Sequence, residues 1–445
     1  MKRLFSNMGW LLGGRGFNAV LSLVYLALAT RALGTVSFGH FALIVALGQA
    51  ITGIANFQTW QFIVRWGANG AAAGATGGDA ETSIDPASAA EATGFAIALD
   101  LVSVVLGIAL ASVVVASAPY WLEVPTELLW LAFFYCVISL AAIRTTPTGI
   151  LRLHFRYASA TAAEAVQPVI RALGAGLAFV FMPTVTGFII AYAVAEVAVT
   201  IALWVVAARV QPVNLRAISL KAIPARHKDA WRFVVSTNLS GSLSIAGKQV
   251  MILLVGTFGG AALAGGFRVA SQLGQALVSL AQTVSKAILP ELVHARDNAL
   301  EIARRMANIA AVGGVIAVVT ALMFGRMGLE LIAGEEFGVF YWAMVILAIA
   351  GAVELVGASL ESLLVSAGKA HVAFIVRAVP TVLALVLLDA AIDWNGAKGA
   401  AFAMLGSSSL AVIGFYVAIL NLSQIRLVVE PEDGTEPQPA PPPDR

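Results

Sequence analysis

AMVILAIAGA at residues 343–352 and VPTVLALVLL at residues 379–388 decide the fold, because neither stretch contains a charged residue. Similar stretches continue along the chain, in which 59% of the 445 residues are hydrophobic and only 12% are charged. An ordinary soluble domain carries about 25% charged residues. The chain therefore has about half the charge that a water-exposed surface needs, and we predict that it lies in a membrane.

The apolar stretches are long and continuous, which favours membrane helices of about 20 residues each. A membrane β-barrel would instead show short segments in which apolar and polar residues alternate. We predict an all-α polytopic membrane protein with twelve spans, near residues 10–30, 38–64, 92–118, 128–150, 160–182, 186–208, 232–257, 266–289, 306–325, 338–367, 372–388 and 397–420.

A basic segment at residues 209–231 divides the predicted spans into two six-helix bundles, 1–208 and 232–420. Residues 421–445 form a Pro-rich polar tail that we expect to be disordered. The pattern Leu33-Gly34 followed by Gly39-His40-Phe41 resembles Val255-Gly256 followed by Gly265-Gly266-Phe267. In both copies we expect a helix to end at the first glycine. The similarity of these two patterns predicts that the two halves are a parallel repeat, as in some transporters.

The distribution of basic residues predicts the orientation, since cytoplasmic loops are enriched in Lys and Arg. With the N-terminus inside, twenty of the 27 Lys and Arg residues fall in cytoplasmic segments, including Arg144, Arg156 and Arg377. Four fall outside, namely Arg31, Arg268, Arg326 and Lys398, and three lie within spans, namely Arg15, Arg171 and Lys248. Both termini are therefore expected in the cytoplasm.

Signatures of catalysis and metal binding are missing from the sequence. The five histidines do not have the spacing of metal ligands, and there is no Walker motif or nucleophile elbow. A net charge of +2 without a basic tract argues against nucleic acid. We expect no catalytic residue, no metal site, no cofactor and no nucleic-acid partner.

Ionisable residues inside membrane spans are expensive, and each is a candidate functional residue. Left in lipid, Arg15, Arg171 and Lys248 would together cost about 8 to 10 kcal/mol. Polar residues recur near them at helical spacing: Asn18 and Ser22; Glu164 and Gln167; Ser240 and Ser244; and, on span eight, Arg268, Gln272, Gln275, Ser279, Gln282 and Lys286. These stripes predict a central hydrophilic, cationic cavity lined by both halves.

Buried acids are the candidates for binding a proton or another cation. Glu354 and Glu361 share one face of span ten. Structural explanations stand beside the functional ones: Glu164 and Arg171 are two turns apart and could form an ion pair, and Arg268 at a span end could extend its charge to the interface. Gln and Ser stripes also form hydrogen bonds between membrane helices.

The segment from Arg31 to Leu43 (RALGTVSFGHFAL), continuing through Phe57 to Arg65, is similar to the opening of bacterial polysaccharide exporters. These are the Wzx-type oligosaccharide flippases of the polysaccharide transporter family in the MOP superfamily, which also contains MATE exporters. The segment from Gly149 through Arg156 resembles the same family.

The resemblance implies two six-helix bundles arranged as a V, with a central cavity that opens alternately to each side of the bacterial inner membrane. The implied substrate is an undecaprenyl-diphosphate-linked oligosaccharide for O-antigen, capsule or exopolysaccharide. Implied partners are this lipid, membrane lipids, and a polysaccharide polymerase and chain-length proteins. Cavity residues expected to bind diphosphate and sugar are Arg15, Asn18, Arg171, Lys248, Arg268, Gln272 and Gln275.

Relatives often carry an acid where Lys248 stands, which puts ion coupling in doubt. Glu354, Glu361, Glu164 or Asp100 could supply H⁺ or Na⁺ coupling instead. A MATE-like ion-coupled small-molecule exporter is the alternative of the same class. A glycan polymerase or ligase is the alternative of a different class, but the external loops, such as 119–127 and 182–186, are too short for a catalytic domain.

Overall fold

Helices make up the secondary structure of the described residues, in agreement with the predicted all-α class. The computed structural model describes residues 2–68, 85–228, 230–288, 299–366 and 369–429, and no strand occurs in these ranges. The first half contains α1 (Lys2–Ala55), α2 (Thr59–Gly67), α3 (Pro86–Ser117), α4 (Thr126–Ala141), α5 (Thr145–Leu153), α6 (Tyr157–Glu164), α7 (Val166–Phe181) and α8 (Val185–Val210). After the short α9 (Ala222–Arg226) come α10 (Ala230–Ile288), α11 (Ala299–Ala333), α12 (Tyr341–Ser366), α13 (Ala370–Val386) and α14 (Leu388–Val429).

Three of the long helices, α1, α10 and α14, are each a pair of helices joined at or beside a glycine, and the join in α14 lies at Asn395 and Gly396. Gly34 in α1 has φ 68° and Gly260 in α10 has φ 81°, a left-handed conformation that glycine adopts without a Cβ clash. Within the described residues, nine helical stretches are long and apolar enough to cross a membrane, and His371–Val386 is a shorter apolar helix. With α1 and α10 each divided at its glycine, these elements correspond to the twelve predicted spans.

Several boundaries differ from the prediction. The expected helix end at Gly34 is confirmed, but its counterpart lies at Gly260 rather than at Gly256. Spans two, four and five are each interrupted, at residues 56–58, 142–144 and 165. α14 remains helical to Val429, beyond the predicted bundle end at residue 420, and the tail from 430 lies outside the described residues.

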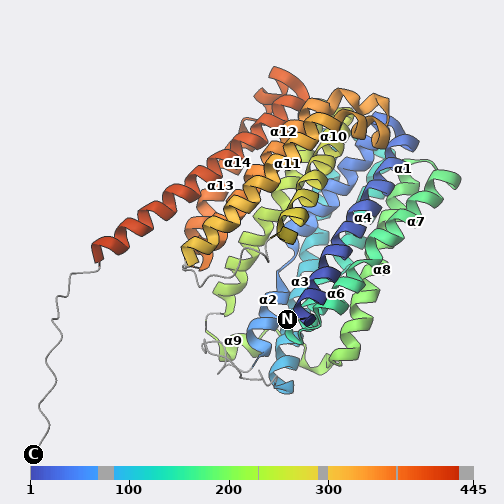
Figure 1. Ribbon diagram of the computed structural model, residues 1–445. Helices are drawn as coiled ribbons and strands as arrows, with labels where there is room; N and C mark the ends of the chain where they lie inside the picture. The colour runs from blue at the N-terminus through green and yellow to red at the C-terminus, as the bar shows by residue number, and fades with distance from the viewer. Residues whose placement is uncertain (1, 69–84, 229, 289–298, 367–368, 430–445) are drawn as a thin grey trace, which may run out of the picture.

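The helices form an inverted V in Figure 1. The α1 to α8 half and the α11 to α14 half lie together at the upper end, where α1 and α10 bend, and they run apart toward the lower end. The first turns of α10 pack on the first half, with Ala230 and Val234 in one apolar cluster with Phe62 and Phe95. α10 therefore crosses the boundary that the sequence placed at residue 232.

Backbone contact between α1 and α10 closes the upper end. The Cα atom of Gly39 lies 2.9 Å from the place that a Cβ atom on Gly265 would take, and a Cβ on Gly39 would overlap the carbonyl oxygen of Ala261. Phe38 and Phe267 are buried beside this crossing in the largest apolar cluster. Small residues let two membrane helices approach closely and gain van der Waals contact.

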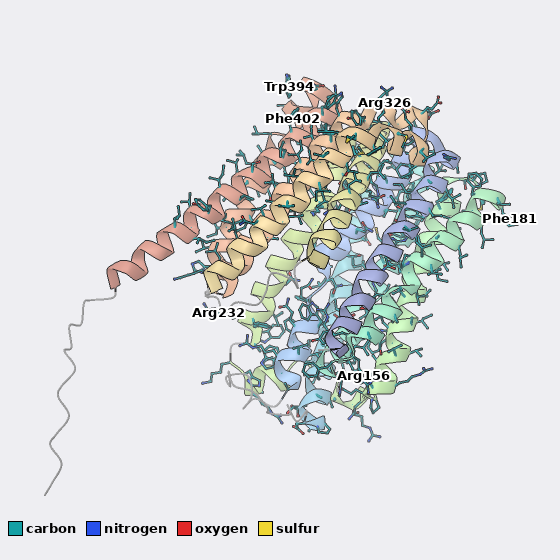
Figure 2. The ribbon with its side chains drawn as sticks, in the orientation of Figure 1. Arg156, Phe181, Arg232, Arg326, Trp394 and Phe402 are labelled. Atoms are coloured by element: carbon teal, nitrogen blue, oxygen red, sulfur yellow. The ribbon has the colours of Figure 1, made fainter. Side chains whose placement is uncertain are left out.

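Large apolar side chains cover the outside of the molecule. Val105, Trp130 and Val386 are each about 70% exposed, which suits contact with lipid chains rather than water. Figure 2 places Arg326 and Trp394 at the upper end and Arg156 toward the lower end. Arg326, which the sequence assigned to the outside, and Arg156, which it assigned to the cytoplasm, therefore lie toward opposite ends of the molecule.

Replacement of Gly39 by alanine is expected to destabilise the protein by about 1 to 3 kcal/mol, because the added methyl group has no room against Ala261 and the two helices must separate. The measurement is the thermal unfolding of the purified full chain in detergent.

Gly176→Ala in α7 is the matched control, since a Cβ atom there meets nothing within 4 Å. It is expected to leave stability unchanged or raise it slightly, because alanine is the better helix former. Equal unfolding temperatures for the two variants would refute the role of close backbone contact.

Candidate functional site

A cavity of about 280 Å³ lies between the two halves. α1, α7 and α8 contribute from the first half, and α12, α13 and α14 from the second, with α10 between them. Its polar lining residues are Gln49, Arg171, Tyr192, Lys248, Gln249, Arg268, Ser271, Gln272, Glu354, Arg377, Thr381, Ser407 and Ser408. Four of these are basic and one is acidic, so the lining carries an excess of three positive charges.

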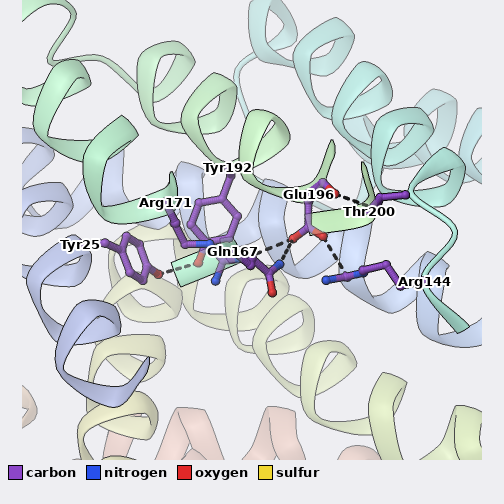
Figure 3. Close-up of polar contacts among 7 residues, drawn as sticks. All are labelled: Tyr25, Arg144, Gln167, Arg171, Tyr192, Glu196 and Thr200. Atoms are coloured by element: carbon purple, nitrogen blue, oxygen red, sulfur yellow. Dashed lines mark hydrogen bonds and ion pairs between the residues drawn. The ribbon is translucent and has the colours of Figure 1, made fainter. Parts of the chain in front are cut away.

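Arg171 is held on the first-half side of the cavity by Glu196 and two tyrosines (Figure 3). Its Nη2 lies 3.2 Å from Oε1 of Glu196, and its Cζ lies 3.9 Å from the centre of the Tyr192 ring. The Tyr192 hydroxyl donates a 2.8 Å hydrogen bond to the hydroxyl of Tyr25. A guanidinium over an aromatic face is attracted to its negative quadrupole, so the position of this cation is tightly constrained.

Glu196 forms ion pairs with two arginines, Arg171 and Arg144. Its Oε1 accepts a 2.7 Å hydrogen bond from Nε2 of Gln167 as well as pairing with Arg171, and its Oε2 lies 2.8 Å from Nη2 of Arg144 (Figure 3). The carboxylate is 3% exposed. One negative charge shared between two guanidinium groups leaves one positive charge on the network.

The second half supplies two looser ion pairs. Nζ of Lys248 on α10 lies 3.3 Å from Oε2 of Glu354 on α12, and Nη2 of Arg377 on α13 lies 3.0 Å from Oε2 of Glu361. These side chains are partly exposed to the cavity side. Pairs in such surroundings are worth at most about 1 kcal/mol, and an incoming anion can compete for their cations.

Arg268 differs from the other three basic residues of the lining. It is 4% exposed, and its Nη1 donates a 3.1 Å hydrogen bond to the carbonyl oxygen of Ala42 on α1. Its Nε is buried without a hydrogen-bond partner, and among the described residues Arg268 makes no ion pair. A buried cation without a counter-charge is costly, which makes this guanidinium a ready site for an anion.

A second cavity of about 400 Å³ lies within the first half and shares Arg171 with the first. Asn18 and Ser22 on α1, Arg144, Glu164 and Gln167 line it. The Oδ1 of Asn18 is buried without a partner. The Arg144–Glu196–Arg171 network therefore stands between the two cavities.

The structure brings together part of the predicted site. Arg171, Lys248, Arg268, Gln272 and Glu354 line the central cavity. Asn18 and Glu164 line the second cavity instead, and Asp100 lies elsewhere in the first half. Gln275 is exposed and is not among the residues lining either cavity, and the side chain of Arg15 lies outside the described ones.

The structure changes the description of several of these residues. Arg268, counted as external, is buried at the cavity because its helix begins at the bend at Gly260, about two turns before Arg268. Arg377 and Arg144, counted as cytoplasmic, belong to the cavity lining and the Glu196 network. Arg171 pairs with Glu196 on the neighbouring helix and not with Glu164.

Glu196, Tyr192 and Tyr25 were not predicted. Glu196 lies within the apolar span 186–208. An ionisable residue inside a membrane span is a candidate functional residue, so Glu196 could have been identified from the sequence. The tyrosines carry no such signal, because a tyrosine in a membrane helix is compatible with many roles. Only the packing of α1 against α7 and α8 places both rings beside Arg171.

The fold and a charged cavity between two helical halves define a multi-pass helical membrane protein of the transporter type. A family model described as polysaccharide biosynthesis protein matches residues 4–295, and the chain belongs to this family. Inner membrane protein YghQ of Escherichia coli (strain K12) is 27% identical over 343 residues, which cover 76% of this chain and 94% of that protein.

Solved structures share the fold, among them the following two. The lipid II flippase MurJ in an inward closed conformation superposes with a TM-score of 0.69 at 12% identity, covering 96% of this chain and 94% of MurJ. An inward-facing multidrug resistance MATE family transporter of the MOP superfamily gives 0.65 at 16% identity, covering 93% and 96%. The predicted resemblance to the polysaccharide family is confirmed by the family model, and the chain has the fold of these two transport proteins.

Glu196→Gln is expected to cost about 3 kcal/mol of stability, because it leaves the Arg171 guanidinium, whose side chain is only 16% exposed, without its counter-charge and also removes the ionic partner of the more exposed Arg144. Thermal unfolding of the purified protein measures the effect.

Glu330→Gln provides the comparison, since Glu330 pairs with an Arg326 side chain that is 74% exposed. That variant is expected to lose less than about 1 kcal/mol. If both variants unfold at the same temperature, the Glu196 network has no special part in stability.

Proposed function

We propose that this protein flips a diphosphate-linked oligosaccharide lipid across the bacterial inner membrane by alternating access. The observation that carries the proposal is Arg268, a buried guanidinium without an acidic partner that faces the central cavity. A diphosphate is a compact dianion, and an Arg fork matches phosphate oxygens in geometry and charge.

The other charges of the cavity suit the same ligand. Lys248 and Arg377 are held by partly exposed carboxylates that a diphosphate can displace, and Arg171 retains part of its charge because Glu196 is shared with Arg144. Ser407, Ser408 and Gln272 offer hydroxyl and amide groups to sugar hydroxyls. An excess of positive charge disfavours cationic drugs, which argues against a MATE-like drug exporter.

The arrangement of the halves supports an inward-facing state under the orientation given by the basic residues. The tightly packed end holds Gly34 and Gly260, which this orientation places outside, and the halves run apart toward the cytoplasmic end (Figure 1). Both termini are then cytoplasmic. Substrate enters from the inner leaflet and leaves once the contact between α1 and α10 opens.

Family membership supports a place in polysaccharide biosynthesis, and the name of YghQ supports the inner membrane. O-antigen, capsule and exopolysaccharide are the expected destinations of the glycan. A polysaccharide polymerase and chain-length proteins are the expected partners. Glu164, Glu354, Glu361 and Asp100 are the candidates for coupling transport to H⁺ or Na⁺.

Proteoliposomes test the proposal directly. Undecaprenyl-diphosphate-linked oligosaccharide is reconstituted in both leaflets, and a membrane-impermeant glycosidase is added outside. Without flipping, only the outer half of the lipid is cleaved, whereas the wild-type protein is expected to make nearly all of it accessible. Arg268→Gln is expected to slow this second phase at least about tenfold, which corresponds to about 1.4 kcal/mol of lost binding.

Arg209→Gln, which removes an exposed charge in the last turn of α8, is the matched control and is expected to flip at the wild-type rate. Gel filtration and unfolding temperature check that Arg268→Gln is folded. Wild-type flipping by a folded Arg268→Gln variant would overturn the diphosphate site, and no second phase with wild-type protein would overturn the function.

A further inference from the structure

Asp100, in the middle of α3, is a buried carboxylate surrounded by hydroxyl groups. It is 2% exposed. The hydroxyls of Thr59 and Thr145 donate to its Oδ1 at 3.1 and 3.2 Å, and the hydroxyl of Thr146 donates to its Oδ2. The carboxylate thereby ties α3 to α2 and α5.

Two interrupted helices meet at this point. α1 ends at Ala55 and α2 begins at Thr59, while α4 ends at Ala141 and α5 begins at Thr145. The carbonyl oxygen of Ala55, freed by the break, accepts a 2.7 Å hydrogen bond from Ser103. In membrane transporters, broken helices supply backbone carbonyls and helix ends that bind ions and substrates.

No positive charge neutralises this carboxylate in the part of the chain that the structure describes. The carboxylates of Glu354, Glu361 and Glu196 all lie in ion pairs, whereas Asp100 makes none among the described residues. Arg144, next in sequence to Thr145, points to Glu196. A buried anion that receives only neutral hydrogen bonds lacks the counter-charge that burial normally demands.

A polar cavity of about 10 Å³ lies beside the carboxylate. Thr52, Asn56, Asp100 and Ser103 line it, together with Leu140 and Ile143, and none of the other lining residues is charged. The Oγ1 of Thr52 is buried there without a hydrogen-bond partner. This volume suits a single occupant of about the size of a water molecule, and the polar groups around it are mostly oxygens.

We propose that Asp100 and Thr52 bind a sodium ion at the junction of the two broken helices. Hard cations take oxygen ligands, and the cavity is lined by the carboxylate of Asp100, the hydroxyls of Thr52 and Ser103, and the side-chain amide of Asn56. Divalent Ca²⁺ sites gather several carboxylates, so a site with one carboxylate matches a monovalent ion.

The coupling role of this ion rests on the proposed flippase function, whereas its binding does not. Sodium neutralises Asp100 and binds the same carboxylate that accepts hydrogen bonds from the hydroxyls of α2 and α5. Occupancy therefore changes how firmly these half-helices are fixed to α3. A ligand shifts a conformational equilibrium only by binding one state more tightly than the other. A change in how α2 and α5 are held against α3 would change the sodium affinity of this site, so the two states would bind sodium differently.

The test is binding of radioactive ²²Na⁺ to the purified full chain, at constant ionic strength in choline chloride and without any lipid substrate. Saturable binding is expected for wild type, and Asp100→Asn is expected to abolish it. Thr52→Val is expected to weaken it at least about tenfold, as is common when a metal site loses a supporting group. Asp393→Asn, at an exposed acid of α14, is the matched control and is expected to bind as wild type does.

Thr52→Val separates an ion site from a structural one, because the Thr52 hydroxyl makes no hydrogen bond that the substitution would break. Unchanged sodium binding in folded Thr52→Val or Asp100→Asn overturns the proposal. So does a wild-type protein whose stability responds to pH but not to Na⁺, since Asp100 then binds a proton. If the protein flips the lipid but does not bind sodium, the sodium site is overturned and the proposed function stands. If it binds sodium but does not flip the lipid, the proposed function is overturned and the sodium site stands.

Discussion

The absence of water in the hydrocarbon layer is the constraint on which this structure depends. A charge there must find a partner within the protein, since lipid offers none. Glu196 forms ion pairs with Arg171 and Arg144, and Glu354 forms one with Lys248. The positions of these few pairs determine which helix faces turn inward, and the rest of each helix is free to be apolar and to face lipid.

Close contact between α1 and α10 is the second determinant of the architecture. Gly39 and Gly265 bring the two backbones together, and Phe38 and Phe267 fill the space beside them. The α1 to α8 half and the α11 to α14 half lie together at this end and run apart toward the other, and the central cavity lies between the two halves (Figure 1). Under the proposed function, this crossing is the contact that opens when the substrate leaves.

Much of the cavity could be predicted from the sequence, and the reason is energetic. Arg171 and Lys248 interrupt apolar spans, so their cost in lipid identifies them. Arg377 and Arg144 were missed because counting charges by side of the membrane treats residues near a span end as loop residues. Whether such a residue faces the cavity depends on where its helix begins, and α13 begins at Ala370, nearly two turns before Arg377.

Composition and periodicity by themselves determined that this is an all-α membrane protein in two halves with a polar interior, because the balance of apolar and charged residues is a property of local sequence. Only the tertiary structure decided which charges pair. Glu196 is 25 residues from Arg171 and 52 from Arg144, and Asp100 is 41 residues from Thr59 and 45 from Thr145. Contacts at such separations arise from helix packing. The spacing of residues along one helix does not predict which other helix packs against it.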